Sequence, residues 1–248
     1  MLAAMTLLSQ ANLLAAGETS YIRYKACSGQ KYVYLSDLAK YYGMVLTKGR
    51  EGCEIRSRLA SFSFTYEKRA GLYNGVKIHY LFAPVFAAPE PLVSEKDYKL
   101  ILDPLIRGAR TFQKKPAKTV LIDPGHGGKD SGAQTRYREK DLNMAISRKL
   151  RTELQKKGFT VYMTRDSDVF IELENRPAKA LSYKADIFIS IHCNSAQDRY
   201  VRGIETYYLT PEGSPSTSDK KSKNTVEKGN SFNKQNLCLA YLIQRCAL

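Results

Sequence analysis

The sequence contains no tryptophan, has only three histidines, and lacks any apolar run long enough to cross a membrane. A membrane-spanning helix needs about 20 consecutive, mostly apolar residues, so we expect no stable membrane span in this chain. Acidic residues are also few, with 24 against 39 lysines and arginines, and the formal net charge is +15. This charge favours an anionic partner, which the charge alone does not identify.

The rest of the composition is that of a folded protein. The 248 residues are 43% hydrophobic and 25% charged, which excludes a wholly disordered chain. A chain of this length is typical of two modest domains or one large domain.

The cysteines follow no pattern known from metal or disulfide sites. Their number is odd, no pair has the CxxC spacing of a cysteine zinc site, and they are Cys27, Cys53, Cys193, Cys238 and Cys246. We expect small buried side chains, and a pairing of Cys27 with Cys53 stays open.

The first 18 residues are similar to a secretory signal peptide. Residues 1–16 are mainly apolar and end in small residues just before Gly17 and Glu18. The positively charged leading segment of a signal peptide is missing, which leaves the first turn of an apolar helix as the alternative. We predict a signal peptide over residues 1–18 and an exported protein.

Residues 19–106 are predicted to form a small α+β module. Short runs of β-branched and aromatic residues predict strands at 31–35, 60–66 and 76–81. Helix signatures begin at Ser36 and Ser94, whose hydroxyl groups suit the N-cap position.

Three segments of this module carry a resemblance. They are Y-V-Y-L-S-D-L-A-K at 32–40, N-G-V-K-I at 74–78 and V-S-E-K-D at 93–97. They resemble the small repeat-like N-terminal domain of copper amine oxidases, which also precedes several envelope enzymes, and the resemblance covers no metal chemistry. His79 lies on the last predicted strand and is expected to be a half-buried structural residue.

The pattern changes after a basic segment at 107–118, which predicts a linker. From 119 to 248, apolar runs alternate with helical spacing, which is typical of an α/β fold with a mostly parallel sheet and helices on both faces. The predicted strands are 119–122, 159–163, 186–191 and 203–209, and the predicted helices are 140–157, 172–185 and 236–247. Residues 210–235 are rich in Ser, Lys, Asn and Gly and predict an irregular loop.

Two of the three histidines, His126 and His192, follow the two most apolar predicted strands. In an open parallel sheet, ligand sites gather at the carboxyl ends of the strands, so the topology brings these side chains to one edge. Glu139 stands at the start of the next helix and can reach the same edge. Two imidazoles and a carboxylate form a known ligand set of catalytic zinc, with a fourth position left for water.

Each part of this arrangement also has an ordinary structural explanation. A glycine-rich turn such as D-P-G-H-G-G at 123–128 is common, because glycine permits tight backbone turns. A glutamate in the first turn of a helix is favoured by the helix dipole alone. Taken one by one, these residues leave a structural role open.

Six segments after residue 118 together form a more specific pattern. They are V-L-I-D-P-G-H-G-G at 120–128, E-K-D-L-N at 139–143, V-Y-M-T-R-D at 161–166, R-P-A-K-A at 176–180, A-D-I-F-I-S-I-H-C-N-S at 185–195 and G-I-E-T-Y-Y-L at 203–209. In this order they resemble the zinc-dependent N-acetylmuramoyl-L-alanine amidases of type 3.

The resemblance implies that His126, Glu139 and His192 are the zinc ligands of a bacterial enzyme. Such an enzyme cleaves the amide between the lactyl group of N-acetylmuramic acid and L-alanine in peptidoglycan, and zinc activates water for attack on this poor electrophile. The expected location is the periplasm or cell wall, the partner is peptidoglycan, and a protein activator is a further candidate. No nucleic-acid recognition module is found, so no nucleic-acid partner is expected.

The neighbours of the histidines have open roles. Asp123 and Asn194 either orient the imidazoles through hydrogen bonds or cap turns. The side chain of Cys193 is expected to point away from the zinc site if the alternation of the strand continues there.

The resemblance has one gap at the end of the sequence. Members of the family use a further glutamate as general base, beyond the helix that starts near Asn236, and the sequence stops at Leu248. We therefore expect a C-terminally incomplete amidase domain without its catalytic base, a loss worth about 10²- to 10⁴-fold in rate. Glu205 is the nearest substitute, although a structural role is expected for it. The alternative function is a zinc-binding but inactive wall-binding or regulatory protein.

Overall fold

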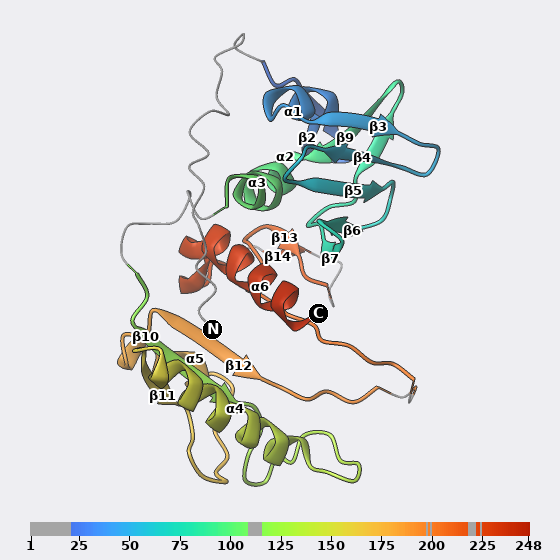
Figure 1. The fold of residues 1–248 in the computed structure, drawn as a ribbon. Coiled ribbons are helices and arrows are strands. Elements are labelled where there is room, and N and C mark those ends of the chain that lie inside the picture. Colours follow the sequence, from blue (N-terminus) through green and yellow to red (C-terminus); the bar gives the residue numbers. More distant parts are fainter. Residues whose placement is uncertain (1–20, 109–115, 197, 199, 218–221, 224) are drawn as a thin grey trace. The chain divides into compact units, whose positions relative to one another are not determined.

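The computed structural model describes residues 21–248 apart from 109–115, 197, 199, 218–221 and 224 (Figure 1). Two compact units share these residues: the first combines the chain before residue 113 with residues 204–248, and the second is residues 113–203. The predicted signal peptide and the middle of the predicted linker lie outside the described residues. Within the described part, no helix is both long and apolar enough to span a membrane.

The part of the first unit before residue 113 contains two antiparallel sheets and several short helices. The sheet orders are β1-β2-β9-β8 and β3-β4-β5-β6-β7. The strands are β1 (Tyr24–Cys27), β2 (Gln30–Tyr34), β3 (Val45–Lys48), β4 (Gly52–Arg56), β5 (Ser61–Thr65), β6 (Ala70–Tyr73), β7 (Val76–His79), β8 (Val85–Ala87) and β9 (Glu90–Ser94). The helices are α1 (Leu35–Tyr41), α2 (Glu95–Asp97), η1 (Tyr98–Leu102) and α3 (Asp103–Arg107). This content agrees with the α+β character predicted for this part of the chain.

Alternating side chains on β5 supply much of the core of the first unit. Phe62 and Phe64 are 0% and 2% exposed, and the residue between them, Ser63, is only half-buried. The ring centre of Phe62 lies 4.4 Å from that of Tyr73 on β6. The period of two along the strand therefore separates the core face from the outer face.

The two predicted helix caps have different outcomes. Ser94 caps α2, because its Oγ accepts a hydrogen bond from the backbone N–H of Asp97 at 3.0 Å. Ser36 is not a cap: α1 begins one residue earlier, at Leu35, and the Ser36 hydroxyl hydrogen-bonds to Glu90. Leu35 is 0% exposed, and its burial in the core explains why α1 starts one residue earlier than predicted. The pattern of capping residues does not contain this information.

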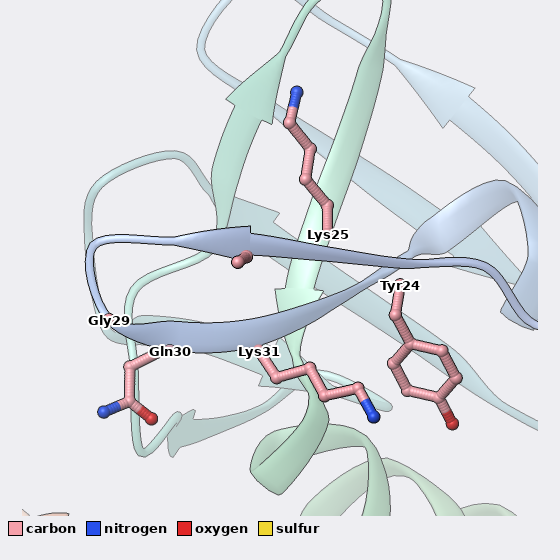
Figure 2. Close-up of a pocket in the computed structure, with 6 residues that line it drawn as sticks. Tyr24, Lys25, Gly29, Gln30 and Lys31 are labelled. Atoms are coloured by element: carbon pink, nitrogen blue, oxygen red, sulfur yellow. The ribbon is translucent and has the colours of Figure 1, made fainter.

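Figure 2 shows the hairpin formed by β1 and β2, which borders a pocket. The Lys31 ammonium lies 4.0 Å from the centre of the Tyr24 ring, a cation–π contact. The pocket is lined by Tyr24, Lys25, Ala26, Gly29, Gln30 and Lys31. It contains no histidine, cysteine or carboxylate and therefore offers none of the usual side-chain ligands of a transition metal.

Residues 204–248 complete the core of the first unit. Helix α6 (Asn233–Ala247) places Leu237 and Cys238 in that core, each 5% exposed. Arg69 donates hydrogen bonds of 2.8 Å to the carbonyl groups of Pro215 and Ser216. Between residues 210 and 235, where we expected only an irregular loop, the structure contains the hairpin strands β13 (Ser214–Pro215) and β14 (Ser222–Lys223) and the 3-10 helix η3 (Lys228–Phe232).

The prediction of a strand at residues 203–209 is wrong. This segment pairs with no strand in the described part of the chain, and Tyr208 packs against the core of the first unit instead. Tyr208 is thus half-buried without strand pairing, whereas Ile204, Tyr207 and Leu209 are exposed. The sequence placed the second domain at 119–248, whereas the structure groups residues 204–248 with the first unit. The family-based domain boundary stays a prediction.

The second unit is a parallel α/β structure. Its sheet has the order β11 (Thr160–Met163), β10 (Thr119–Pro124), β12 (Ile187–Ile191), with both pairs parallel. Helix α4 (Glu139–Lys156) connects β10 to β11, and α5 (Asn175–Ser182) connects β11 to β12. The two connections run in opposite directions along the sheet, so right-handed crossovers place the two helices on opposite faces. The predicted α/β fold with helices on both faces is confirmed.

Strand β10 lies at the centre of this sheet and carries the candidate site at its carboxyl end. Val120, Leu121 and Ile122 are at most 1% exposed, as expected of a strand covered on both faces. Helix α5 is shorter than predicted and has Pro177 in its first turn, where a helix does not need the missing N–H.

All five cysteines are free. Cys53 and Cys238 are buried as expected, Cys27 and Cys193 are half-buried, and Cys246 is exposed. The Cys27–Cys53 pairing that the sequence left open is therefore not formed.

Candidate metal centre

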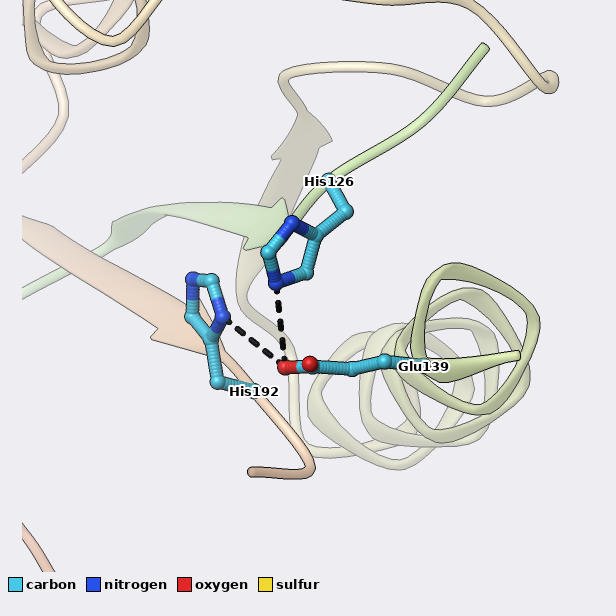
Figure 3. A group of neighbouring side chains, drawn as sticks. All are labelled: His126, Glu139 and His192. Carbon is cyan, nitrogen blue, oxygen red and sulfur yellow. Dashed lines mark hydrogen bonds and ion pairs between the residues drawn. The ribbon is translucent and has the colours of Figure 1, made fainter. Parts of the chain in front are cut away.

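The predicted meeting of His126, Glu139 and His192 is confirmed by the structure. His126 follows β10, His192 directly follows β12, and Glu139 is the first residue of α4. The Glu139 Oε1 atom lies 3.2 Å from Nε2 of His126 and 3.1 Å from Nδ1 of His192 (Figure 3). One ligand atom from each residue falls within 4.8 Å of the others. Three segments distant in sequence thus present one cluster of metal-ligating atoms.

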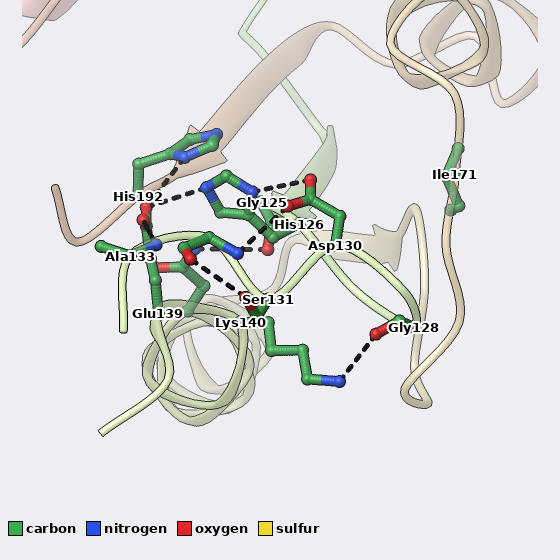
Figure 4. Close-up of polar contacts among 12 residues, drawn as sticks. Gly125, His126, Gly128, Asp130, Ser131, Ala133, Glu139, Lys140, Ile171 and His192 are labelled. Atoms are coloured by element: carbon green, nitrogen blue, oxygen red, sulfur yellow. Dashed lines mark hydrogen bonds and ion pairs between the residues drawn. The ribbon is translucent and has the colours of Figure 1, made fainter. Parts of the chain in front are cut away.

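A tight turn presents the His126 side chain. His126 itself has φ +61°, and Gly127 and Gly128 follow with φ +130° and +57°. A left-handed backbone costs a non-glycine residue roughly 1–2 kcal/mol, so surrounding contacts must hold His126 in place. Its Nδ1 atom lies 2.8 Å from the Asp130 carboxylate (Figure 4). This contact favours a proton on Nδ1 and leaves the Nε2 lone pair facing Glu139 and His192.

The Glu139 carboxylate is buried and is held by hydrogen bonds from backbone N–H groups. Its side chain is 4% exposed. Oε1 accepts a hydrogen bond from Cys193 N at 3.0 Å, and Oε2 accepts one from Ala133 N at 2.9 Å. Burial raises the pKa of Glu139, but these backbone hydrogen bonds and the two imidazoles outweigh it, and the pKa is lowered overall. The carboxylate is therefore ionised at neutral pH, as a metal ligand must be.

Two glycines allow the three ligands to approach one another. A Cβ atom on Gly125 would lie 2.4 Å from the His192 ring. A Cβ atom on Gly132 would lie 2.6 Å from the His126 ring and 2.8 Å from Glu139. Only glycine fits at these two places in the turn and the loop after it.

Two of the three separations among the ligand atoms suit a zinc ion, and the widest, up to 4.8 Å, would have to shorten when a metal binds. Ligand atoms around tetrahedral zinc, each about 2.0–2.1 Å from the metal, are about 3.3 Å apart. The two separations from Glu139 Oε1, 3.2 and 3.1 Å, match this spacing. Two nitrogens and one carboxylate oxygen are also the donor set of open, catalytic zinc sites.

Asp123 does not have the role that the sequence left open for it. Its carboxylate is 2% exposed and bonds to Thr164, Ser190 and Arg176, not to a histidine. It links the carboxyl ends of the three strands, because Ser190 is its register partner on β12 and Thr164 directly follows β11.

The remaining neighbours can also be placed. Asn194 is exposed, and no hydrogen bond within the described residues joins it to His192. Cys193 contributes its backbone N–H to Glu139, and burial raises the pKa of its thiol. Glu205 belongs to the first unit, where it is exposed and accepts a hydrogen bond from Tyr207 at 2.7 Å. His79, expected to be half-buried, is exposed at the end of β7.

The partner of His126 that sequence reasoning missed is Asp130. It lies four residues after the histidine in the same glycine-rich segment, and the turn at residues 126–128 brings the two side chains together. The glycines at 127 and 128 were the available signal for that turn.

Residues 120–245, just over half of the chain, match the sequence family described as N-acetylmuramoyl-L-alanine amidase. The chain belongs to this family. It is 45% identical over 104 residues to the N-acetylmuramoyl-L-alanine amidase AmiC of Escherichia coli O6:H1, a match that covers 41% of this chain and 25% of that protein. It is 38% identical over 104 residues to the probable cell wall amidase LytH of Staphylococcus aureus, covering 40% of this chain and 34% of that protein.

A solved structure of the amidase AmiC2 of Nostoc punctiforme is 44% identical over 37% of this chain and 52% of that chain, with a TM-score of 0.36. The matched region spans about a quarter to a third of the length of the two curated relatives.

Proposed function

We propose that this protein binds Zn²⁺ through His126, Glu139 and His192 and hydrolyses the amide between N-acetylmuramic acid and L-alanine in peptidoglycan. The observation that carries the proposal is the meeting of two imidazoles and an ionised carboxylate at the carboxyl edge of the parallel sheet. Membership of the amidase family and the names of the relatives support the substrate class.

The residues of the chain have distinct tasks in this proposal. Glu139 supplies a fixed negative charge, because backbone N–H groups from two loops hold both of its oxygens. Asp130 keeps the His126 ring in one orientation and one tautomer. Bound zinc would polarise the amide carbonyl and lower the pKa of water toward about 7. Three protein ligands leave room for substrate or water in a tetrahedral site.

The proposal is tested by incubating the zinc-loaded protein with purified peptidoglycan. The expected product is stem peptide with a new free amino group on L-alanine, seen by mass spectrometry. His126→Ala should abolish the release and the binding of zinc, whereas His79→Ala, which changes an exposed histidine of the first unit, should alter neither. Binding of zinc and of peptidoglycan by the unaltered protein without any release would instead support the inactive wall-binding function.

We also propose that the protein works outside the cytoplasm, in the periplasm or cell wall, with peptidoglycan as its partner and a protein activator as a second partner. The apolar leader and the name of the cell wall relative support this location. Cleavage after the leader, read by N-terminal sequencing of protein secreted by a bacterial host, is the expected result. A cytoplasmic, uncleaved product would contradict it.

A further inference from the structure

Two arginines are buried beneath the turn that carries His126. Arg165 and Arg176 are 4% and 5% exposed. Arg176 forms an ion pair of 2.9 Å with Asp123, but Arg165 bonds only to backbone carbonyl groups among the partners that the structure gives it. Buried guanidinium groups are costly unless their donors are used, so the pair requires an explanation.

The explanation lies in the carbonyl groups of the turn. Arg165 donates to Pro124 O at 2.9 Å and to Gly125 O at 3.0 Å. Arg176 donates to Pro124 O at 3.2 Å and to His126 O at 3.0 Å. The carbonyl groups of three consecutive residues therefore point toward two buried cations.

The next two carbonyl groups are also bound. Gly127 O accepts from the Asp130 N–H at 3.1 Å. Gly128 O accepts from the ammonium of Lys140, itself buried, at 2.9 Å (Figure 4). Every carbonyl from residue 124 to residue 128 thus has an internal partner, and most of these partners are cationic side chains from outside the turn.

We propose that Arg165 and Arg176 are positioning residues that hold this turn in its final shape before any metal binds. With its carbonyl groups turned inward, the backbone keeps His126 at φ +61° and directs its ring toward Glu139 and His192. The consequence is a higher affinity for the metal, because a turn that is already ordered loses less conformational freedom when the metal binds. This consequence rests on the proposed zinc site.

Lysine cannot take over this task. A guanidinium carries five N–H donors in a rigid fork, whereas an ammonium is a single point of charge on a flexible stem. Arg176 contacts Asp123, Pro124, His126 and Ile171 at once. Arg176→Lys keeps the charge beside Asp123 but loses most of the carbonyl contacts, so it separates positioning from charge.

The first test measures zinc affinity by competition with a chromophoric chelator, on the full chain and on Arg176→Lys and Arg165→Lys. Arg151→Lys is the matched control, because Arg151 lies on α4 of the same unit and pairs with Asp166 near the surface. We expect about 10-fold weaker zinc binding for the first two variants, the lower end of the effect of groups that support metal ligands, and no change for the control. Variants that are folded by circular dichroism and bind zinc as tightly as the unaltered protein would overturn the inference.

A second test uses the unaltered protein and does not depend on the folding of any variant. The N–H of Gly125 donates to Ile191 O at 2.9 Å, and the N–H of Gly127 donates to Asp130 O at 2.8 Å. If the turn is preset, both amides are protected from hydrogen exchange in the zinc-free protein, and zinc changes their protection little. Free exchange without zinc followed by protection with zinc would refute the inference. Absence of zinc binding by the unaltered protein would refute the proposed function instead.

Discussion

Gly125→Ala should remove one zinc ligand without disturbing the fold. The new Cβ would lie 2.4 Å from two atoms of the His192 ring, about 1 Å closer than an ordinary contact. The backbone at Gly125 is not in the left-handed region, so alanine introduces no conformational strain there. The His192 side chain is 41% exposed and is free to swing away, so the ring rather than the turn should move.

The size of this shift decides the effect. Zinc–nitrogen distances in proteins vary by only about 0.2 Å around 2.0–2.1 Å, so a displacement of about 1 Å breaks the bond. We expect zinc affinity to fall by at least 10-fold, measured by chelator competition, while the unfolding temperature by circular dichroism changes little.

Gly158→Ala is the control for this prediction. Gly158 has φ +86° and open space around it, so alanine there should cost about 1 kcal/mol of stability and leave zinc affinity unchanged. Tight zinc binding by a folded Gly125→Ala protein would refute the placement of His192 in the site.

Three further predictions concern single side chains. Asp130→Ala should weaken zinc binding by about 10- to 100-fold in a chelator competition with little loss of stability, since its side chain is 42% exposed; unchanged affinity would contradict its role beside the histidine. Burial raises the pKa of Asp37, but the hydrogen bonds and charge of Arg23 outweigh burial and lower this pKa overall. The pair therefore stabilises the fold above the usual aspartate pKa of about 4, and this contribution is lost as the pH falls through the lowered pKa. Asp37→Asn should flatten that part of an acid titration followed by circular dichroism, and an unchanged titration would count against the pair. Leu237→Ala should lower the free energy of unfolding of the first unit by about 2–5 kcal/mol, measured by urea unfolding, because Leu237 is buried. Leu242→Ala should have little effect, because Leu242 on the same helix is 50% exposed. Equal effects of the two variants would argue against the packing of α6.

The sequence predicts the second unit well because its signals are local. Continuous apolar runs mark the strands, and helical spacing from residue 140 marks α4. The meeting of His126 with His192 follows from a rule of topology, since parallel strands end at one edge. No side-chain detail is needed for that step.

The supporting contacts depend on three-dimensional information that the sequence does not display. Arginine is usually exposed, so the sequence suggests surface positions for Arg165 and Arg176. Their burial depends on a turn that points its carbonyl groups inward. Asp123 was a reasonable partner for a histidine by spacing, yet its side chain lies on the sheet face toward Thr164. Position along the strand does not reveal which of several nearby polar groups an aspartate will bond to.

The segment at 203–209 shows a different limit of pattern reasoning. Its alternating residues fit a strand, but alternation records only that one side of the segment is buried. In the structure, Tyr208 packs against the hydrophobic core of the first unit, to which the segment from residue 204 belongs, and Ile204 stays exposed. Tertiary packing determines which surface a segment packs against, and a period of two in the sequence does not specify that surface.

X-ray absorption at the zinc edge of the metal-loaded protein shows whether His126, Glu139 and His192 bind zinc. We expect one zinc per chain with only nitrogen and oxygen neighbours near 2.0–2.1 Å, and the outer-ring scattering of two imidazoles. His126→Ala should remove one imidazole or the metal itself. A sulfur neighbour near 2.3 Å, which would point to Cys193, or no bound zinc at all would show that these three residues are not the ligands.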